Sequence, residues 1–117
     1  MTDTTVYGIR SCDTMRRARR WLDERDVEHA FHDYKTQGLD AARLERWAAR
    51  VGWDQLLNRR GTTWRRLDPA ERDGIDAAKA IGLMAAHPSL VRRPVVERGD
   101  EVIVGFDDTL WTKLFGR

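Results

Sequence analysis

The sequence has one cysteine, three prolines and no long apolar run, and these shortages exclude several classes of protein. A single cysteine, Cys12, cannot form a disulfide within the chain, so nothing points to an oxidising compartment. The N-terminus lacks the basic start and apolar stretch of a signal peptide. No segment approaches the roughly 20 apolar residues that a membrane span requires. These absences predict a soluble, cytoplasmic protein without membrane contact.

Neither sign of charge dominates the chain. Its 21 basic residues are interleaved with 19 acidic ones, for a net charge of +2. No long run carries one sign, which argues against a nucleic-acid partner and fits small anionic ligands at least as well. One cysteine and three histidines without a recurrent ligand spacing give no metal site. A chain of 117 residues, 41% of them hydrophobic, fits a single domain over residues 1–117.

The first third of the chain has the pattern of a βαβ unit. Residues 4–9 (TTVYGI) are β-branched and aromatic, which is typical of a strand. Apolar residues at helical spacing predict a helix that begins near Asp13. Residues 27–34 (VEHAFHDY) alternate between apolar and polar residues, which predicts a second, parallel strand. The expected core positions of that strand are Val27, His29 or Ala30, Phe31 and Tyr34.

The middle of the chain has the pattern of a helical insertion over approximately residues 38–88. Asp40 is the expected N-cap of its first helix, and Asp68 precedes Pro69 at the expected start of a later one. Strand signals return at residues 94–97 and 101–106, joined by a hairpin turn around Gly99. A final helix is expected to follow Asp107 or Asp108, with Leu110, Leu114 and Trp111 on its apolar face. The order predicts an α/β fold: βαβ, helical insertion, ββα.

Cys12 lies where the first strand gives way to the first helix, and this position favours a reactive thiol. The first turn of a helix has unpaired backbone N–H groups and the positive end of the helix dipole, and both stabilise a thiolate. They lower the pKa of such cysteines and also bind oxyanions. Arg10, Arg16 and Arg17 could add positive potential. The alternative is that Cys12 is a small buried hydrophobic residue, the commoner role of a lone cysteine.

Four motifs in register carry a family resemblance: YGIRSCDTMRRARRWL, LLNRRGTTWRRL, RRPVV and VGFDD. Together they resemble the arsenate-reductase-like (ArsC/Spx) family, and within it the YffB-type proteins, over nearly the whole chain. The resemblance implies a thioredoxin-like α/β core with a helical insertion subdomain.

The same resemblance implies roles for individual residues. Cys12 would be the nucleophile, Arg93 would help to bind an oxyanion, and Pro94 would be the cis proline beside the thiol. Arg60, Arg10 and Asn58 are further candidates for binding an anion. Without the resemblance, Arg93 and Pro94 have the pattern of a plain strand start.

The chain departs from arsenate reductases at two positions and from Spx-type regulators at one. Asn58 and Gly105 stand where arsenate reductases carry arginines, and Arg60 compensates only in part. Each lost charge-assisted contact would weaken oxyanion binding by about 1.5–3 kcal/mol. Met15 stands where the Spx regulators carry the second cysteine of a redox switch, so no internal disulfide can form.

Three functions remain open on these grounds. The first is a glutathione-dependent thiol reductase without a bound cofactor, acting on a small anionic or disulfide substrate, with glutathione as co-substrate and glutathione or a glutaredoxin as the resolving thiol. The second is an Spx-like regulator that contacts RNA polymerase. The third is a glutathione- or glutaredoxin-dependent arsenate reductase.

Overall fold

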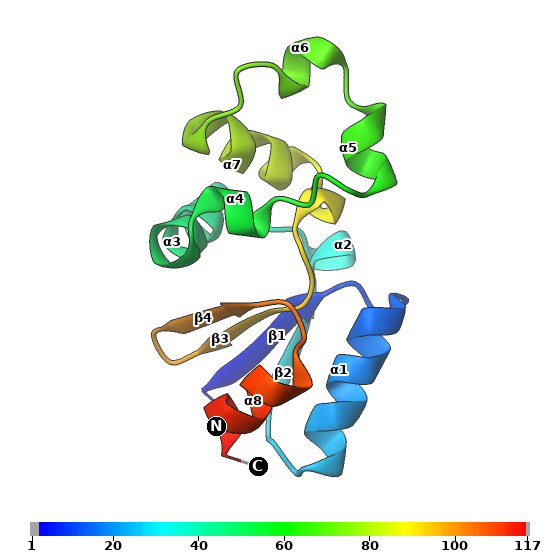
Figure 1. The fold of residues 1–117 in the computed structure, drawn as a ribbon, viewed down its shortest axis with the longest axis vertical. Coiled ribbons are helices and arrows are strands. Elements are labelled where there is room, and N and C mark those ends of the chain that lie inside the picture. The colour runs from blue at the N-terminus through cyan, green and yellow to red at the C-terminus, as the bar shows by residue number, and fades with distance from the viewer. Residues whose placement is uncertain (1–2, 117) are drawn as a thin grey trace. The chain divides into compact units, whose positions relative to one another are not determined.

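The computed structural model describes residues 3–116 of the chain, which form two compact units (Figure 1). The first unit contains residues 3–33 and 93–116, and the second contains residues 34–92. The insertion expected at residues 38–88 lies within the second unit. Among residues 3–116, no helix is long and apolar enough to cross a membrane.

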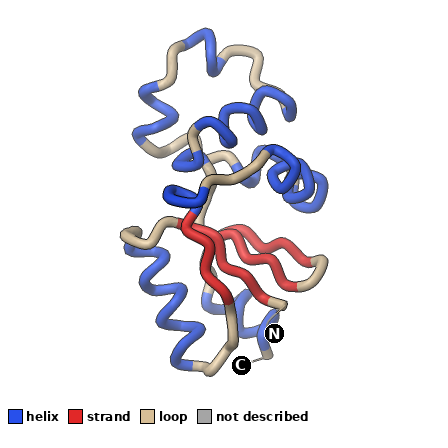
Figure 2. Tube along the Cα trace, turned by 180° about the vertical axis from the view of Figure 1, so that it is seen from behind, coloured by secondary structure: helices blue, strands red, loops and turns tan. Residues whose placement is uncertain are grey.

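A four-stranded sheet organises the first unit (Figure 2). Its strands are β1 (Thr4–Gly8), β2 (Ala30–Asp33), β3 (Val95–Arg98) and β4 (Glu101–Val104), in the spatial order β2-β1-β3-β4. β1 and β2 are parallel, whereas β3 is antiparallel to both β1 and β4. The register places Val6 opposite Phe31 on one side and Val96 on the other. The predicted βαβ unit and C-terminal hairpin are therefore confirmed.

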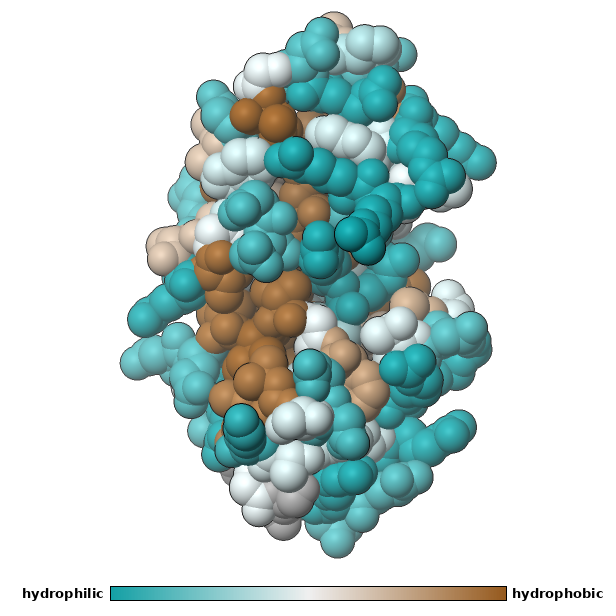
Figure 3. Space-filling model, in the orientation of Figure 1, coloured by the Kyte–Doolittle hydropathy of each residue, from teal (hydrophilic) through white to brown (hydrophobic). Residues whose placement is uncertain are grey.

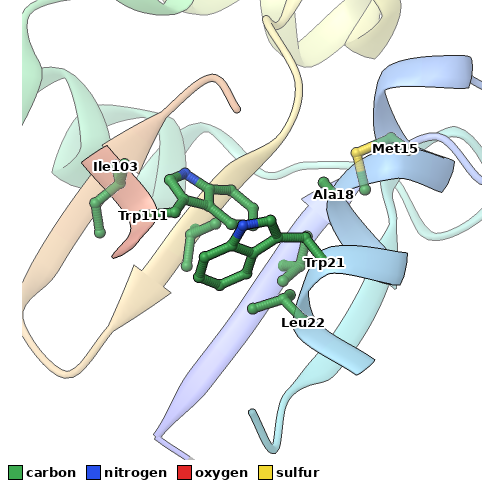
Figure 4. Close-up of a cluster of buried hydrophobic side chains, with 8 residues drawn as sticks. Met15, Ala18, Trp21, Leu22, Ile103 and Trp111 are labelled. Carbon is green, nitrogen blue, oxygen red and sulfur yellow. The ribbon is translucent and has the colours of Figure 1, made fainter. Parts of the chain in front are cut away.

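Two helices, α1 (Asp13–Glu24) and α8 (Asp108–Phe115), pack on one face of this sheet. Their buried side chains form a core with three strand residues (Figure 4). The buried members of this core are Val6, Met15, Ala18, Trp21, Leu22, Val96, Ile103 and Trp111. Trp111 is fully buried, and its ring meets those of Trp21, Phe106 and Phe115 at centroid distances of 5.6, 4.8 and 5.7 Å. Aromatic edge-to-face packing of this kind adds to the burial of apolar area.

The second unit is helical. Its helices are α2 (Tyr34–Gln37), α3 (Ala41–Val51), α4 (Trp53–Leu56), α5 (Thr62–Arg66), α6 (Pro69–Arg72) and α7 (Ala77–Ala86), followed by the 3₁₀ helix η1 (Pro88–Leu90). Asp40 is the N-cap of α3, as predicted, because its carboxylate accepts a hydrogen bond from the Arg43 N–H. Asp76 caps α7 in the same way. α2 and α5 were not predicted, since four or five residues are too few for a helical period to show.

Two core predictions and one strand boundary need correction. The second strand is shorter than residues 27–34: Tyr34 begins α2 instead, where it is fully buried and its hydroxyl donates to the Val91 carbonyl oxygen. Ala30 is exposed rather than buried. Leu110 is 42% exposed, because α8 turns Trp111 rather than its neighbour toward the sheet.

Candidate functional site

Cys12 is the N-cap residue of α1, directly after the loop that leaves β1. Its backbone N–H donates to the Ile9 carbonyl oxygen at 3.2 Å, and its own carbonyl oxygen accepts from the Arg16 N–H at 3.0 Å. The backbone is extended at this residue (φ −81°, ψ 136°), as is usual for an N-cap. The thiol is half-buried, so the alternative of a sealed apolar cysteine does not apply.

Groups of the first helical turn and of the opposite loop act on the thiol. Partial burial raises the pKa of Cys12. The backbone N–H of Met15, the guanidinium of Arg93 and the backbone N–H of Thr14 lower it, and so does the positive charge of Arg93. The net effect is a pKa below the ordinary value for cysteine. These are the physical causes that depress cysteine pKa values at helix N-termini.

Packing between Met15 and Gly8 fixes the first turn of α1 against β1. A Cβ atom at Gly8 would lie 2.3 Å from Sδ of Met15 and 2.6 Å from its Cε. Met15 itself is fully buried. The absent side chain at Gly8 therefore lets α1 approach the strand closely, which sets the position of the Met15 amide that faces the thiol.

The loop before β3 supplies the guanidinium. Arg93 precedes Pro94, and the peptide bond between them is cis, as the resemblance implies. Pro94 is buried, and its carbonyl oxygen accepts a hydrogen bond from the Gly105 N–H at 2.8 Å. Because β3 lies next to β1, Cys12 and Arg93, 81 positions apart in the sequence, meet at the end of the sheet where α1 begins.

The other arginines near Cys12 have partners other than the sulfur. The Arg10 guanidinium lies 5.5 Å from the centre of the Phe31 ring, and the Arg10 N–H donates to the Asp33 carboxylate. Arg16 pairs with Asp13, whose pKa it lowers. Arg17 lies 5.6 Å from the centre of the Phe106 ring. Arg93 is thus the guanidinium that acts on the thiol, and the expected contribution of Arg10, Arg16 and Arg17 is absent from the groups that shift its pKa.

Asn58 and Arg60 belong to the second unit, so their contact with a ligand at Cys12 stays a prediction. The Asn58 carboxamide oxygen accepts from the Arg60 N–H at 3.0 Å, which closes a local turn. The Arg60 carbonyl oxygen in turn accepts from the Arg65 guanidinium at 2.6 Å. The Arg60 side chain is exposed.

The ArsC family model matches residues 7–114 of this chain. The chain belongs to the ArsC family. A solved structure of a YffB protein superposes with a TM-score of 0.92 at 50% identity, covering 94% of this chain and 96% of its own. An arsenate reductase (ArsC) related protein from Brucella melitensis superposes with a TM-score of 0.77 at 48% identity, covering 100% of this chain and 97% of its own.

A relative with a different role is the global transcriptional regulator Spx of Streptococcus mutans. It is 27% identical over 106 residues, which are 89% of this chain and 77% of the regulator. Together these matches establish the thioredoxin-like α/β fold of the ArsC family and its thiol-redox character. The resemblance found in the four sequence motifs is thereby confirmed.

One departure from the ArsC arsenate reductases has a visible local reason. Gly105 adopts φ +90°, a conformation that residues with a side chain rarely adopt. This turn directs the Gly105 N–H at the Pro94 carbonyl oxygen. The position expected to hold an arginine therefore anchors the Pro94 loop through its backbone and offers no positive charge.

Proposed function

We propose that the chain is a glutathione-dependent thiol reductase whose nucleophile is the Cys12 thiolate. The observation that carries the proposal is the convergence of two backbone N–H groups and the Arg93 guanidinium on a half-buried sulfur. A thiolate is the reactive form of cysteine, and a lowered pKa raises its population at neutral pH. Membership of a thiol-redox family supports the same conclusion.

Cys12 takes part in two thiol–disulfide exchanges. The Cys12 thiolate attacks one sulfur of a disulfide substrate, forms a mixed disulfide and releases the other sulfur as a thiolate, which takes up a proton. Because the chain has no second cysteine, an external thiolate must attack the mixed disulfide. That thiolate, from glutathione or a glutaredoxin, attacks the substrate sulfur of the mixed disulfide, forms a new disulfide with it and releases Cys12 as a thiolate. A second glutathione reduces the new disulfide, so that two thiols are oxidised for each substrate disulfide reduced. No bound cofactor takes part, and the reducing cytoplasm supplies the glutathione.

The charged residues have different parts in this proposal. Arg93 stabilises the Cys12 thiolate and is the first candidate for the carboxylate of a bound thiol, since a guanidinium can form charge-assisted hydrogen bonds to both. Arg60 and Asn58 remain the further candidates for that carboxylate or for an oxyanion. Arg10 is the weakest candidate for binding an anion, because its guanidinium lies over the Phe31 ring. Pro94 shapes the loop on which Arg93 is held.

Mass spectrometry after exposure to oxidised glutathione tests the proposal. The expected result is rapid addition of one glutathione to Cys12, reversed by reduced glutathione and absent in Cys12→Ser. Free cysteine of a short peptide, at the same pH, serves as the reference for the rate. A Cys12 that reacts no faster than this peptide contradicts the proposal. Adding arsenate and measuring glutathione oxidation tests the arsenate-reductase alternative, which the missing arginines at positions 58 and 105 disfavour.

The second candidate function is an Spx-like regulator that binds RNA polymerase. Its support is the likeness to Spx and the exposed basic side chains of Arg59, Arg60, Arg65 and Arg66 around α5. Purified RNA polymerase retained by the immobilised protein, equally well in Cys12→Ser, would favour this function. If the Cys12→Ser protein no longer retains RNA polymerase, or if neither protein retains it, the reductase remains the favoured function.

A further inference from the structure

A shallow pocket lined by charged and aromatic side chains opens beside α1, within the same unit as the thiol. Its volume is about 320 Å³, at the lower end of the range for ligand pockets. The pocket is lined by side chains of α1, of the residue that follows it and of the loop that enters α8: Arg17, Arg20, Trp21, Glu24, Arg25, Phe106 and Asp108. In the view of Figure 3, the surface on the side of α1 is mostly hydrophilic. None of these residues serves the exchange reaction proposed above.

Charge is divided unevenly along the pocket. At the far end, Arg25 lies 3.9 Å from carboxylate oxygens of both Glu24 and Asp108, and its guanidinium covers the Trp21 ring at 4.2 Å. Among residues 3–116, neither Arg17 nor Arg20 forms an ion pair, and both are exposed. Within the described residues, the end of the pocket nearer to Cys12 therefore carries two guanidinium groups that form no ion pair, although the charge of Arg17 also acts on the Asp13 carboxylate.

Measured along the helix axis, the end of the pocket that carries Arg17 and Arg20 lies within reach of a molecule joined to Cys12. Arg17 and Arg20 follow Cys12 by five and eight residues on one helix, which is about 7.5 and 12 Å along its axis. An extended polypeptide advances about 3.3 Å per residue, so it covers this distance in roughly two to four residues. Phe106, which lines the pocket under Arg17, packs against the same core cluster as Cys12. Cys12 and Phe106 therefore pack against one common core.

We propose that this pocket binds acidic residues of a polypeptide disulfide substrate, about two to four residues from the sulfur that Cys12 attacks. The inference rests on the proposed function and narrows its substrate class to acidic polypeptides. Arg17 and Arg20 bind the substrate carboxylates, and the paired Arg25, Glu24 and Asp108 repel further acidic residues at the far end. Electrostatic attraction of this kind acts mainly on the association rate and weakens as salt screens it.

Three synthetic peptides that differ only in charge test the substrate preference. Each has the sequence Cys-Gly-X-X-Gly with the cysteine as a pyridyl disulfide, where X is glutamate, glutamine or lysine. Attack by the Cys12 thiolate forms the protein–peptide disulfide and releases thiopyridone, whose absorbance gives the rate. We expect the glutamate peptide to react about tenfold faster than the lysine peptide at low salt, and the difference to shrink in high salt.

Paired variants locate the preference. In Arg17→Gln combined with Arg20→Gln, the ratio of the glutamate rate to the lysine rate is expected to fall close to one. The control is Arg46→Gln combined with Arg50→Gln, which removes two exposed arginines of α3 and should keep the wild-type ratio. Equal rates for the three peptides in the wild type, or an unchanged ratio in the α1 variant, overturn the inference. If all three peptides react fast and at equal rates, this inference is wrong but the proposed reductase function is still supported.

A binding measurement separates this inference from the chemistry of the thiol. Peptides with serine in place of cysteine are titrated into the Cys12→Ser protein while backbone amide shifts are followed by NMR. Shifts at Arg17, Arg20 and Phe106 with the glutamate peptide, and none with the lysine peptide, support the pocket even if Cys12 proves unreactive. Equal shifts with inorganic phosphate would make the pocket a small-anion site and overturn the polypeptide assignment.

Discussion

The two units of this chain use their polar side chains differently. In the second unit, long cations hold backbone turns: Lys79 donates to the carbonyl oxygens of Ala70 and Asp73, and Arg65 donates to that of Arg60. In the first unit, Arg25 and Arg98 likewise donate to the carbonyl oxygens of Trp21 and Leu114, and strands and a cluster of aromatic rings set the shape. The Arg93 guanidinium and two backbone N–H groups there face a sulfur instead of a carbonyl oxygen.

This difference indicates where chemistry can be supported. A thiolate needs hydrogen-bond donors that are not already bonded to a carbonyl oxygen. The packing of the surrounding residues must hold these donors in place. The first unit meets this requirement because Met15, Pro94 and Gly105 fix the loops around Cys12. The turn at Asn58 and Arg60 does not meet this requirement, because its polar groups are already used in hydrogen bonds that close the turn.

The largest expected effect on stability is the loss of an aromatic ring from the first unit. Trp111→Ala removes a fully buried indole and leaves the Gly105 carbonyl oxygen without the indole N–H that donates to it at 3.1 Å. We expect a loss of about 3–5 kcal/mol, from the cavity and the lost burial. Trp64 lies in helix α5 of the second unit and is half-buried, so Trp64→Ala should lower the free energy of unfolding clearly less. Urea unfolding of both variants measures the difference, and equal losses would show that burial of the ring does not set its contribution to stability.

Two glycines provide a second comparison, with effects of opposite sign. Gly8→Ala forces the fully buried Met15 to move, and overpacking of this kind costs about 1–3 kcal/mol. It should also slow alkylation of Cys12, because the Met15 N–H faces the thiol.

The matched change is Gly82→Ala in α7, where a Cβ meets nothing within 4 Å. That variant should gain about 0.5–1 kcal/mol from better helix propensity. Thermal unfolding measures both, and a stable Gly8→Ala protein with normal alkylation would show that the contact is not needed.

Sequence patterns predicted the helices and strands of the first unit better than they predicted which residues meet in space. The β-branched and aromatic residues of β1 and the helical period of α1 are local signals, so both elements and the place of Cys12 between them could be predicted. The meeting of Arg93 with Cys12 depends on the strand order β2-β1-β3-β4, which periodicity does not give; only the family resemblance indicated it. The orientation of Arg10 toward Phe31 could not be predicted either, because spacing does not fix where a long side chain points.

Removing one guanidinium from each unit tests which of them acts on the thiol. Arg93→Gln should raise the pKa of Cys12, because a hydrogen bond and a positive charge are lost, and Arg60→Gln should leave this pKa unchanged. The pH dependence of iodoacetamide alkylation measures both. An equal upward shift in the two variants would contradict the assignment to Arg93.

The pH dependence of stability follows from the same shift. The lowered pKa stabilises the wild-type fold fully above about pH 8.5, the usual pKa of an unfolded cysteine, and this contribution is lost as the pH falls through the folded value. In Arg93→Gln the contribution should be smaller, because the two pKa values lie closer together.

The smallest expected effect comes from the turn at Asn58. Asn58→Ala removes the acceptor of the Arg60 N–H, and a hydrogen bond of this kind contributes about 0.5–1.5 kcal/mol. Asn58→Asp keeps the acceptor and should retain most of that stability. Neither variant should change the pKa of Cys12, because the groups that act on the thiol all lie in the first unit. Urea unfolding and alkylation of the same samples measure the two quantities, and a shift in alkylation would give the second unit a direct part in activating the thiol.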